Sequence, residues 1–294
     1  MKKLILSLCF LSNFAFAADP ETIVFSFQKQ KNPDEIQVMA KTVAEYLTKQ
    51  IGKKVEVLVP VSYGTTAQGL ISKKVHVAYM DSLPYILASK EASLEIIAVE
   101  RRKDRTEYDS LVVVPVNSPA KTLNDLKGKS IAFTSQTSTS GFLFPFAKLV
   151  QDKSIKKPAD LKSFFSNITY AGGYDKALLA VANGQADAAA FSDYVYEGAK
   201  ADLYGTAETR AKVRVLQRIP GVPTHLVTAS KELSVGLRAK IQEALLQLSK
   251  DKPELIASVY GASQLVVPER KNHVEKTMMA LTSTDLAADH FVSK

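Results

Sequence analysis

The stretch from Ser130 to Val150 reads SIAFTSQTSTSGFLFPFAKLV, and the rest of the chain can be understood as a frame around it. Residues 130–134 form a short apolar run typical of a strand, and the apolar spacing of residues 142–150 predicts a helix. Between them lies a hydroxyl-rich turn, Thr137-Ser138-Thr139-Ser140-Gly141. The first amides of a helix have no partner within it and carry partial positive charge, so such a turn attracts anions. We call residues 137–141 the cradle and interpret them as an oxyanion-binding turn.

A plainer interpretation is that one cradle residue only caps the helix, as Ser and Thr often do. One hydroxyl would fill that role, whereas the cradle has four in a row, and Gly141 would let the backbone approach a ligand closely. Pro145 complicates the helix, because inside a helix proline removes a hydrogen bond. We therefore expect either a kink at Pro145 or an irregular first turn.

The amino terminus has the pattern of a secretory signal peptide. Lys2 and Lys3 precede an apolar run, and Ala15-Phe16-Ala17 matches an A-x-A cleavage site. We expect cleavage near Ala17 and localisation in the periplasm. The single cysteine, Cys9, lies within this segment, so thiol nucleophiles, cysteine metal sites and disulfides are excluded from the expected mature chain. No later stretch reaches the ~18 apolar residues of a transmembrane helix.

Strands and helices alternate along the remaining chain, which predicts an α/β fold with parallel or mixed sheets. Long apolar strands near residues 109–116 and 213–220 are candidates for two crossings between lobes. We expect the signal peptide at residues 1–17, lobe one at residues 18–111 and 217–294, and lobe two at residues 112–216. Two α/β lobes in an exported chain of this length suggest a binding protein whose ligand lies in a cleft between lobes that close about a hinge.

Several stretches together resemble the phosphate, phosphite and phosphonate-binding proteins of ABC importers. They are Ser138-Thr139-Ser140-Gly141 followed by Pro145, Gly172-Gly173-Tyr174-Asp175-Lys176-Ala177, Asn183-Gly184-Gln185-Ala186-Asp187-Ala188, and the turn around Tyr79 to Tyr85. The resemblance covers essentially the whole mature chain. It implies a type II periplasmic binding protein fold, with a hinge and an interlobe cleft that holds a tetrahedral oxyanion.

Carried over position by position, the resemblance implies which residues bind the anion. Ser138, Thr139 and Ser140 would donate from lobe two, Tyr63 and either Tyr85 or Tyr79 would close from lobe one, and Asp193 would be an acid facing the cleft. The family usually has His after the glycine pair, and here that position is Tyr174. A protonated His supplies charge, whereas Tyr supplies one neutral O–H donor and a larger apolar face.

The expected function is therefore that of a non-enzymatic binding protein without cofactor or metal, which delivers a small phosphorus oxyanion to an ABC permease in the inner membrane. By analogy it would be a monomer, and the distributed lysines argue against a nucleic-acid partner. Two alternatives stay open: a sensor that presents its ligand to a membrane kinase or receptor, and, with less support, an exported hydrolase. A hydrolase needs a nucleophile paired with a base, and no such motif occurs.

Several other polar residues have a structural interpretation. Asp81 and Ser82 are expected to cap the helix that follows them, and Asp187 to be a turn acid. The four histidines have no metal-ligand spacing and are expected to be structural: His76, His225, His273 and His290. The charge run from Arg101 to Arg105 is expected to be a solvated loop, with contact to the permease as the alternative.

Overall fold

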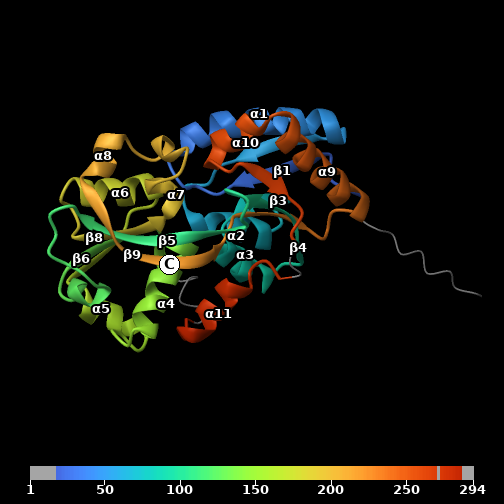
Figure 1. Cartoon of the computed structure of the whole chain (residues 1–294). Coiled ribbons are helices and arrows are strands. Elements are labelled where there is room, and N and C mark those ends of the chain that lie inside the picture. The colour runs from blue at the N-terminus through green and yellow to red at the C-terminus, as the bar shows by residue number, and fades with distance from the viewer. Residues whose placement is uncertain (1–17, 270–271, 287–294) are drawn as a thin grey trace, which may run out of the picture.

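The computed structural model describes residues 18–269 and 272–286, which form two lobes, each built on one β-sheet (Figure 1). The lobe coloured green to yellow in Figure 1 lies beside a lobe that combines the blue amino-terminal elements with the orange carboxy-terminal ones. This arrangement confirms the expected two-lobed α/β fold. The expected signal peptide and His290 lie outside the described residues. Within the described ranges, no helix has the length and apolar character needed to span a membrane.

The first lobe is built on a mixed sheet in which β1 pairs in parallel with β2 and β3, and β10 pairs antiparallel with β3 and β4. Among the described residues its strand order is β11-β4-β10-β3-β1-β2. The strands are β1 Thr22–Phe27, β2 Lys54–Leu58, β3 Val77–Met80, β4 Leu94–Arg101, β10 Leu226–Ser230 and β11 Gln264–Val266. The helices around it are α1 Pro33–Ile51, α2 Tyr63–Ile71, α3 Ser82–Ser89, α9 Val235–Asp251 and α10 Pro253–Tyr260.

The second lobe has a smaller mixed sheet with the order β7-β6-β8-β5-β9 among the described residues. β6 pairs in parallel with β7 and β8, whereas β5 runs antiparallel to β8 and β9. The strands are β5 Glu107–Pro115, β6 Ser130–Phe133, β7 Asn167–Tyr170, β8 Ala188–Ser192 and β9 Val213–Pro223. The helices are α4 Phe144–Gln151, α5 Leu161–Phe164, α6 Tyr174–Ala182, α7 Asp193–Tyr196 and α8 Ala207–Ala211.

The chain crosses between the lobes at residues 102–106 and again at residues 224–225. Thr224 joins the two crossings, because its N–H donates to the Thr106 carbonyl at 3.0 Å and its hydroxyl to the Glu100 carbonyl at 2.6 Å. The expected lobe boundaries differ by a few residues. All of β5 and β9 pair within the second sheet, so that lobe begins before residue 112 and continues beyond residue 216.

The charge run from Arg101 to Arg105 is therefore not simply a solvated loop. It forms the tight turn of the first crossing, in which Arg102 and Arg105 exchange backbone hydrogen bonds of 2.8 and 2.9 Å. Lys103 and Asp104 lie at its tip with positive φ, while Arg102 is buried. Lys103, Asp104 and Arg105 have the exposure that the sequence suggested.

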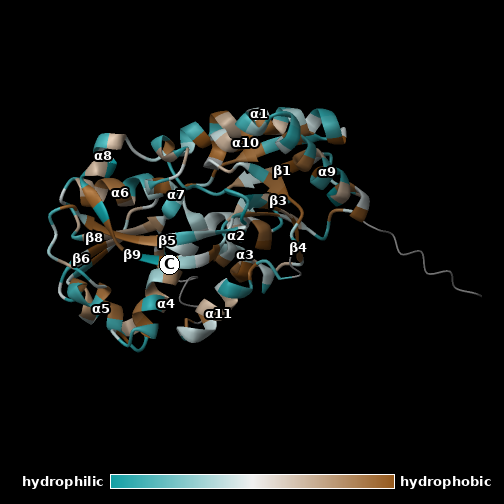
Figure 2. Ribbon diagram, viewed as in Figure 1, coloured by the Kyte–Doolittle hydropathy of each residue, from teal (hydrophilic) through white to brown (hydrophobic). Residues whose placement is uncertain are grey.

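Each lobe has its own hydrophobic core, and apolar residues concentrate in the strands and the helix faces packed on them (Figure 2). The second core is rich in aromatic rings, with Phe133 and Phe142 packed edge to face at 5.1 Å. The last described helix, α11 Glu275–Ser283, contacts α3 of the first lobe and α4 and β9 of the second. The expected second part of lobe one thus ends in a helix that bridges both lobes.

Candidate functional site

The cradle follows β6 and opens an irregular helix. The hydroxyl of Ser138 accepts a hydrogen bond from the Gly141 amide at 3.0 Å, as an N-cap does. The first turn, Thr139–Leu143, is a π-helix, with the Leu143 amide bonded to the Ser138 carbonyl at 3.1 Å. Pro145 then occupies the first turn of α4, where its missing N–H costs little. Of the two expected outcomes for Pro145, the irregular first turn is the one observed.

Ser140 lies at the centre of a buried hydroxyl cluster. Its Oγ is 2.8 Å from Ser192 Oγ, 3.2 Å from the Tyr174 hydroxyl and 3.4 Å from the Tyr108 hydroxyl, which donates to it. Burial raises the pKa of Tyr174 to about 12, with the nearby Asp81 carboxylate acting in the same direction. The tyrosines therefore stay neutral, and the cluster offers O–H donors and lone pairs without formal charge.

Thr139 joins the two lobes. Its Oγ1 accepts a hydrogen bond from the Leu83 amide at 3.0 Å and lies 3.3 Å from Ser82 Oγ. Ser82 Oγ is in turn 2.7 Å from the hydroxyl of Thr277 on α11. The amino-terminal turn of α3 thus faces the cradle across the cleft, and the fully buried side chains show that the lobes are closed here.

Asp81 was expected to cap α3, but its side chain makes no capping hydrogen bond. Its Oδ2 instead accepts from the Thr139 amide at 3.3 Å, and its Oδ1 contacts Nε2 of His225. Ser82 likewise points across the cleft to Thr139. The structural interpretation of these two residues is therefore wrong, because their side chains turn toward the cradle instead of back onto the helix.

Tyr63 begins α2 and is fully buried beside the cluster. Its ring packs edge to face on Tyr174 with 6.2 Å between centroids. Burial raises the pKa of Tyr63 well above its ordinary value, and the Tyr174 and Asp81 side chains add to the effect. The Tyr63 hydroxyl has no hydrogen-bond partner among the described residues. A buried O–H without a hydrogen bond lowers the stability of the folded protein, unless a ligand accepts that hydrogen bond.

Behind Asp81, a chain of buried charges runs into the hinge. His225 Nδ1 lies 3.1 Å from Oε2 of Glu100, which also accepts from Nε of Arg102 at 2.8 Å. Burial opposes the charge on His225, but the Glu100 and Asp81 carboxylates outweigh it and raise the pKa of His225 to about 9. Burial likewise opposes the charge on Glu100, but Arg102 and His225 lower its pKa to about 2.

The structure brings together five of the residues expected at the site: Tyr63, Ser138, Thr139, Ser140 and Tyr174. Tyr79 lies one step away, because its hydroxyl donates to Glu100 Oε1 at 2.5 Å within the hinge network. Tyr85 lies elsewhere, half-buried in a different hollow that Lys231 and His273 also line. Of the two tyrosines considered for closure from lobe one, neither contacts the cradle.

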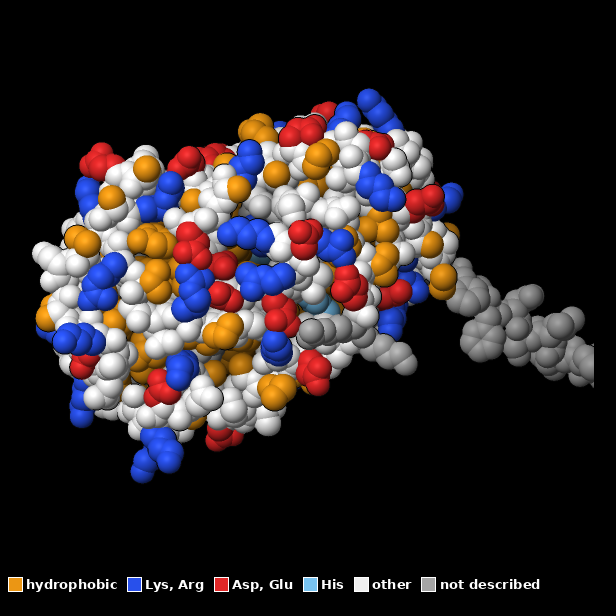
Figure 3. Space-filling model, viewed as in Figure 1, with side chains coloured by type: hydrophobic (Ala, Val, Ile, Leu, Met, Phe, Trp, Pro, Cys, Tyr) orange, Lys and Arg blue, Asp and Glu red, His pale blue; other side chains and the backbone are white. Residues whose placement is uncertain are grey.

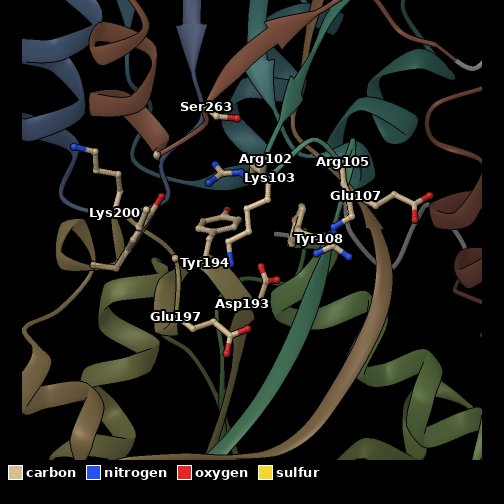
Figure 4. A pocket seen from close by; sticks show the side chains of 14 residues that line it. Arg102, Lys103, Arg105, Glu107, Tyr108, Asp193, Tyr194, Glu197, Lys200 and Ser263 are labelled. Atoms are coloured by element: carbon tan, nitrogen blue, oxygen red, sulfur yellow. The ribbon is translucent and has the colours of Figure 1, made fainter.

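Asp193 also lies away from the cradle. It lines a separate cavity of about 110 Å³ at the hinge, with Arg102, Lys103, Tyr108 and Tyr194 (Figure 4). In this view Lys103 extends toward Asp193. Burial, together with the neighbouring Asp109 carboxylate, raises the pKa of Asp193 above its ordinary value. The rings of Tyr108 and Tyr194, 5.3 Å apart, also line this cavity.

On the surface above this cavity, charges of both signs gather where the lobes meet (Figure 3). Arg218 on β9 donates to Asp109 at 3.0 Å and to Glu197 at 2.8 Å, and Lys276 on α11 donates to Glu107 at 2.7 Å. Exposed ion pairs of this kind contribute little to stability. Because both signs are interspersed, this face has no single-sign patch that would mark an anion-binding surface.

Sequence reasoning missed four residues of the site: Asp81, Tyr108, Ser192 and His225. His225 was expected to be structural, and the structure places its imidazole between the Asp81 and Glu100 carboxylates, next to the cradle. Asp187 does behave as a turn acid, accepting from the amide and hydroxyl of Ser130 at 2.8 and 2.7 Å. Within the described ranges no group of three or more His, Cys, Asp or Glu side chains is arranged to hold a metal ion.

Residues 25–272 match the family described as the periplasmic substrate-binding protein of a phosphonate ABC transporter. The chain is 30% identical over 176 residues to a phosphate-import protein of Mycolicibacterium smegmatis, a match that covers 58% of this chain and 54% of that one. It is 25% identical over 266 residues to the phosphonates-binding periplasmic protein of Escherichia coli, covering 86% and 76% of the two chains.

Solved structures share the fold. A protein of Prochlorococcus marinus, solved in complex with methylphosphonate, superimposes with a TM-score of 0.76 at 19% identity. The superposition covers 90% of this chain and all of the other. The two-lobed architecture is thus common to both proteins, although their sequences have diverged widely.

Proposed function

The chain belongs to the family of periplasmic substrate-binding proteins of phosphonate ABC transporters, and on this premise we propose that it captures a small phosphorus oxyanion between its lobes for delivery to an inner-membrane permease. The relatives named above import phosphate or bind phosphonates, and this chain shares its fold with a protein solved in complex with methylphosphonate. A phosphate, phosphite or phosphonate group is the chemistry common to them.

The observation that carries the proposal is the convergence of donors on a fully buried cradle. Amides of the π-helix and the hydroxyls of Ser138, Thr139, Ser140, Tyr108 and Tyr174 come from the second lobe, and the hydroxyl of Tyr63 comes from the first. Tyr63 adds a buried O–H that no described residue accepts. Donors fixed in a dry site stabilise an anion without having to reorganise, and leaving them unpaired is unfavourable.

Lobe closure would couple binding to release. The ligand has no path to the cradle while Asp81 and the Leu83 amide contact Thr139 from the opposite lobe, so the lobes must open about residues 102–106 and 224–225. A ligand held by both lobes favours the closed state by its additional affinity for that state. The permease would then receive the ligand when it opens the lobes again.

The serines of the cradle do not have the surroundings of a nucleophile. Ser140 Oγ contacts other hydroxyls, and His225 faces the Asp81 and Glu100 carboxylates instead of a serine. A nucleophilic serine needs a base within hydrogen-bond reach. Members of this family are binding proteins, not enzymes, and the arrangement agrees with that role.

We also propose that the chain is exported by cleavage after Ala17 and acts as a monomer. The lysine-led apolar segment and the A-x-A site support cleavage. Mass spectrometry of the protein recovered from a periplasmic extract should give a chain that begins at Ala18. Recovery of the uncleaved chain would contradict this route.

A thermal-shift panel tests the proposed function. The chain from Ala18 onward is heated with phosphate, phosphite, methylphosphonate, aminoethylphosphonate, sulfate and simple carboxylates. A ligand that binds only the folded state raises the melting temperature as its concentration exceeds the dissociation constant. We expect a selective rise with at least one phosphorus oxyanion, and loss of that rise in Ser140→Ala.

Ser163→Ala is the matched control, because this exposed serine in α5 donates to the nearby Asp160 carbonyl and has no described hydrogen bond to the cradle. It should keep the wild-type response. If no phosphorus oxyanion shifts the wild type, or if Ser140→Ala responds as fully as Ser163→Ala, the cradle is only a helix cap.

A further inference from the structure

We propose that Asp81 selects the protonation state of the ligand, because its carboxylate accepts a hydrogen bond from a P–OH group. The site therefore binds phosphorus monoanions that keep one proton on oxygen, and it rejects sulfonates and sulfate. This inference rests on the proposed function and narrows its ligand class. Near neutral pH a phosphonate or phosphate can keep one proton on oxygen, whereas sulfonate and sulfate oxygens carry none.

The position of Asp81 is the first step of the argument. Its Oδ2 lies 3.3 Å from the Thr139 amide, one of the donors of the cradle, and the side chain is completely buried. The backbone holds it there, because the Asp81 amide donates to Oε1 of Gln28 at 3.1 Å. Any anion seated on the cradle therefore lies against this carboxylate or competes with it for the same amide.

The second step is the hydrogen-bonding capacity of the neighbours. The hydroxyls of Tyr63, Tyr174 and Ser140 can each donate or accept, and the Thr139 amide only donates. An ionised carboxylate only accepts. A fully deprotonated ligand brings acceptors alone, so it would place oxygen lone pairs against Asp81 where little water screens the repulsion. A ligand with one P–OH converts that contact into a short charge-assisted hydrogen bond.

The third step concerns the neighbours that let the Asp81 carboxylate act as a hydrogen-bond acceptor. His225 faces Oδ1 of Asp81 through Nε2 and Glu100 through Nδ1, so a doubly protonated imidazole can donate to both carboxylates. Arg102 balances Glu100 from the other side at 2.8 Å. The elements packed around Asp81 thus contribute one imidazolium, one amide and neutral hydroxyls. The imidazolium contacts Oδ1, and among the described contacts no positive charge lies on Oδ2, the oxygen that faces the cradle.

The test compares affinities for isosteric anions by calorimetry, at a pH below the second pKa of the phosphonate. We expect the wild type to bind methylphosphonate at least about 100-fold more tightly than methanesulfonate, since a site with a fixed polar partner rejects analogues that lack the matching group. Asp81→Asn replaces one acceptor oxygen with an N–H₂ donor and should reduce the preference to about tenfold or less.

Asp193→Asn is the matched control, because Asp193 is a half-buried carboxylate that lines the hinge cavity and has no hydrogen bond to the cradle among its described contacts. It should keep the wild-type preference. If Asp81→Asn binds methylphosphonate and still excludes methanesulfonate as the wild type does, the inference is overturned while the proposed function stands. Failure of the wild type to bind any phosphorus oxyanion overturns the proposed function itself.

A second measurement on the wild type covers the case in which Asp81→Asn does not fold. Its affinity for methylphosphonate should fall about tenfold for each pH unit above the second pKa of the ligand, because only the protonated anion is accepted. Methanesulfonate, which does not titrate there, provides the baseline. An affinity for methylphosphonate that stays constant or rises across that range contradicts the role of Asp81.

Discussion

His225 carries its charge in a completely buried position because two carboxylates flank it, Asp81 toward the cradle and Glu100 toward the hinge. Burying a charge is unfavourable unless it is paired and hydrogen-bonded. Tyr174 supplies no charge at the position where a His was expected, so the nearest imidazolium to the cradle comes from the opposite lobe. This imidazolium contacts Asp81, and Asp81 in turn contacts the cradle. A ligand on the cradle would therefore lie next to the Asp81 carboxylate.

The charge on His225 predicts a defined pH dependence of stability. Its pKa is about 9 in the folded chain and 6.5 in its ordinary state. A raised pKa gives stability that is fully present below about pH 6.5 and lost as the pH rises through 9, amounting to about 3 kcal/mol. His225→Gln should therefore lower the free energy of unfolding more at pH 6 than above pH 9, as measured by urea denaturation.

His76→Gln provides the comparison. Burial lowers the pKa of His76, so the folded chain disfavours the protonated imidazole. His76→Gln should therefore lower the free energy of unfolding less at low pH than at high pH. If His225→Gln loses the same free energy at both ends of the range, the imidazole is neutral and the hinge network is held together in another way.

At the scale of the element, the π-helix Thr139–Leu143 is what turns the amides and hydroxyls of the cradle inward. Gly141 is required within it, because a Cβ at that position would overlap the Thr134 side chain. Thr134 cannot move away freely, since its hydroxyl donates to the Ala190 carbonyl at 2.8 Å and its amide to the Gly141 carbonyl at 3.1 Å. The turn therefore packs tightly on the end of β6.

Gly141→Ala should distort this turn. We expect a loss of about 1–3 kcal/mol in the free energy of unfolding, typical of overpacking, together with a loss of ligand binding. Gly236→Ala in α9 is the control, because its Cβ would meet nothing closer than the Ser234 hydroxyl at 4.0 Å and alanine favours a helix by up to ~1 kcal/mol. If Gly141→Ala is as stable as Gly236→Ala and still binds ligand, the close packing at the cradle has no functional role.

At the scale of the whole molecule, the closed cleft is joined by hydrogen bonds that cross from one lobe to the other. The Leu83 amide donates to Thr139, and Ser82 contacts Thr277 on the bridging helix α11. The two crossings lie close together, because Thr224 bonds the Thr106 carbonyl. A hinge confined to one side allows the cradle to be exposed or buried without rearranging either core.

Ligand binding should therefore slow amide hydrogen exchange at the cleft more than elsewhere. We expect at least about tenfold slower exchange at Thr139 and Leu83 with methylphosphonate present, because both amides are exposed only when the lobes separate. Helix α9, which packs within lobe one, is the internal reference and should change little. Equal slowing in α9 and at the cleft would indicate global stabilisation without lobe closure.

Much of the fold could be predicted because local patterns determine it. The strand, turn and helix at residues 130–150 follow from apolar spacing and turn chemistry. The strand β11 at residues 264–266 is not evident from the sequence. Such a short edge strand has little pattern of its own, and pairing with β4 defines it.

The direction of individual side chains was harder to predict. Ser192 is the last residue of β8 and Asp193 is the first residue of α7, so the backbone changes conformation between them. Ser192 contacts the cradle, whereas Asp193 lines the hinge cavity. Tyr85 lies in the second turn of α3, while the side of that helix facing the cradle is its amino-terminal end.

The sequence by itself determined the α/β lobes, the hydroxyl-rich cradle and the resemblance to phosphonate-binding proteins, because each depends on residues close together in the chain. Only the tertiary structure decided that Asp81 and His225 meet beside the cradle and that Tyr108 and Ser192 complete its hydroxyl cluster. These residues lie far apart in the sequence, in two strands and two connecting segments of both lobes. Their contacts form only when the sheets are folded and the lobes have closed, so they cannot be predicted from the local spacing of residues in the sequence.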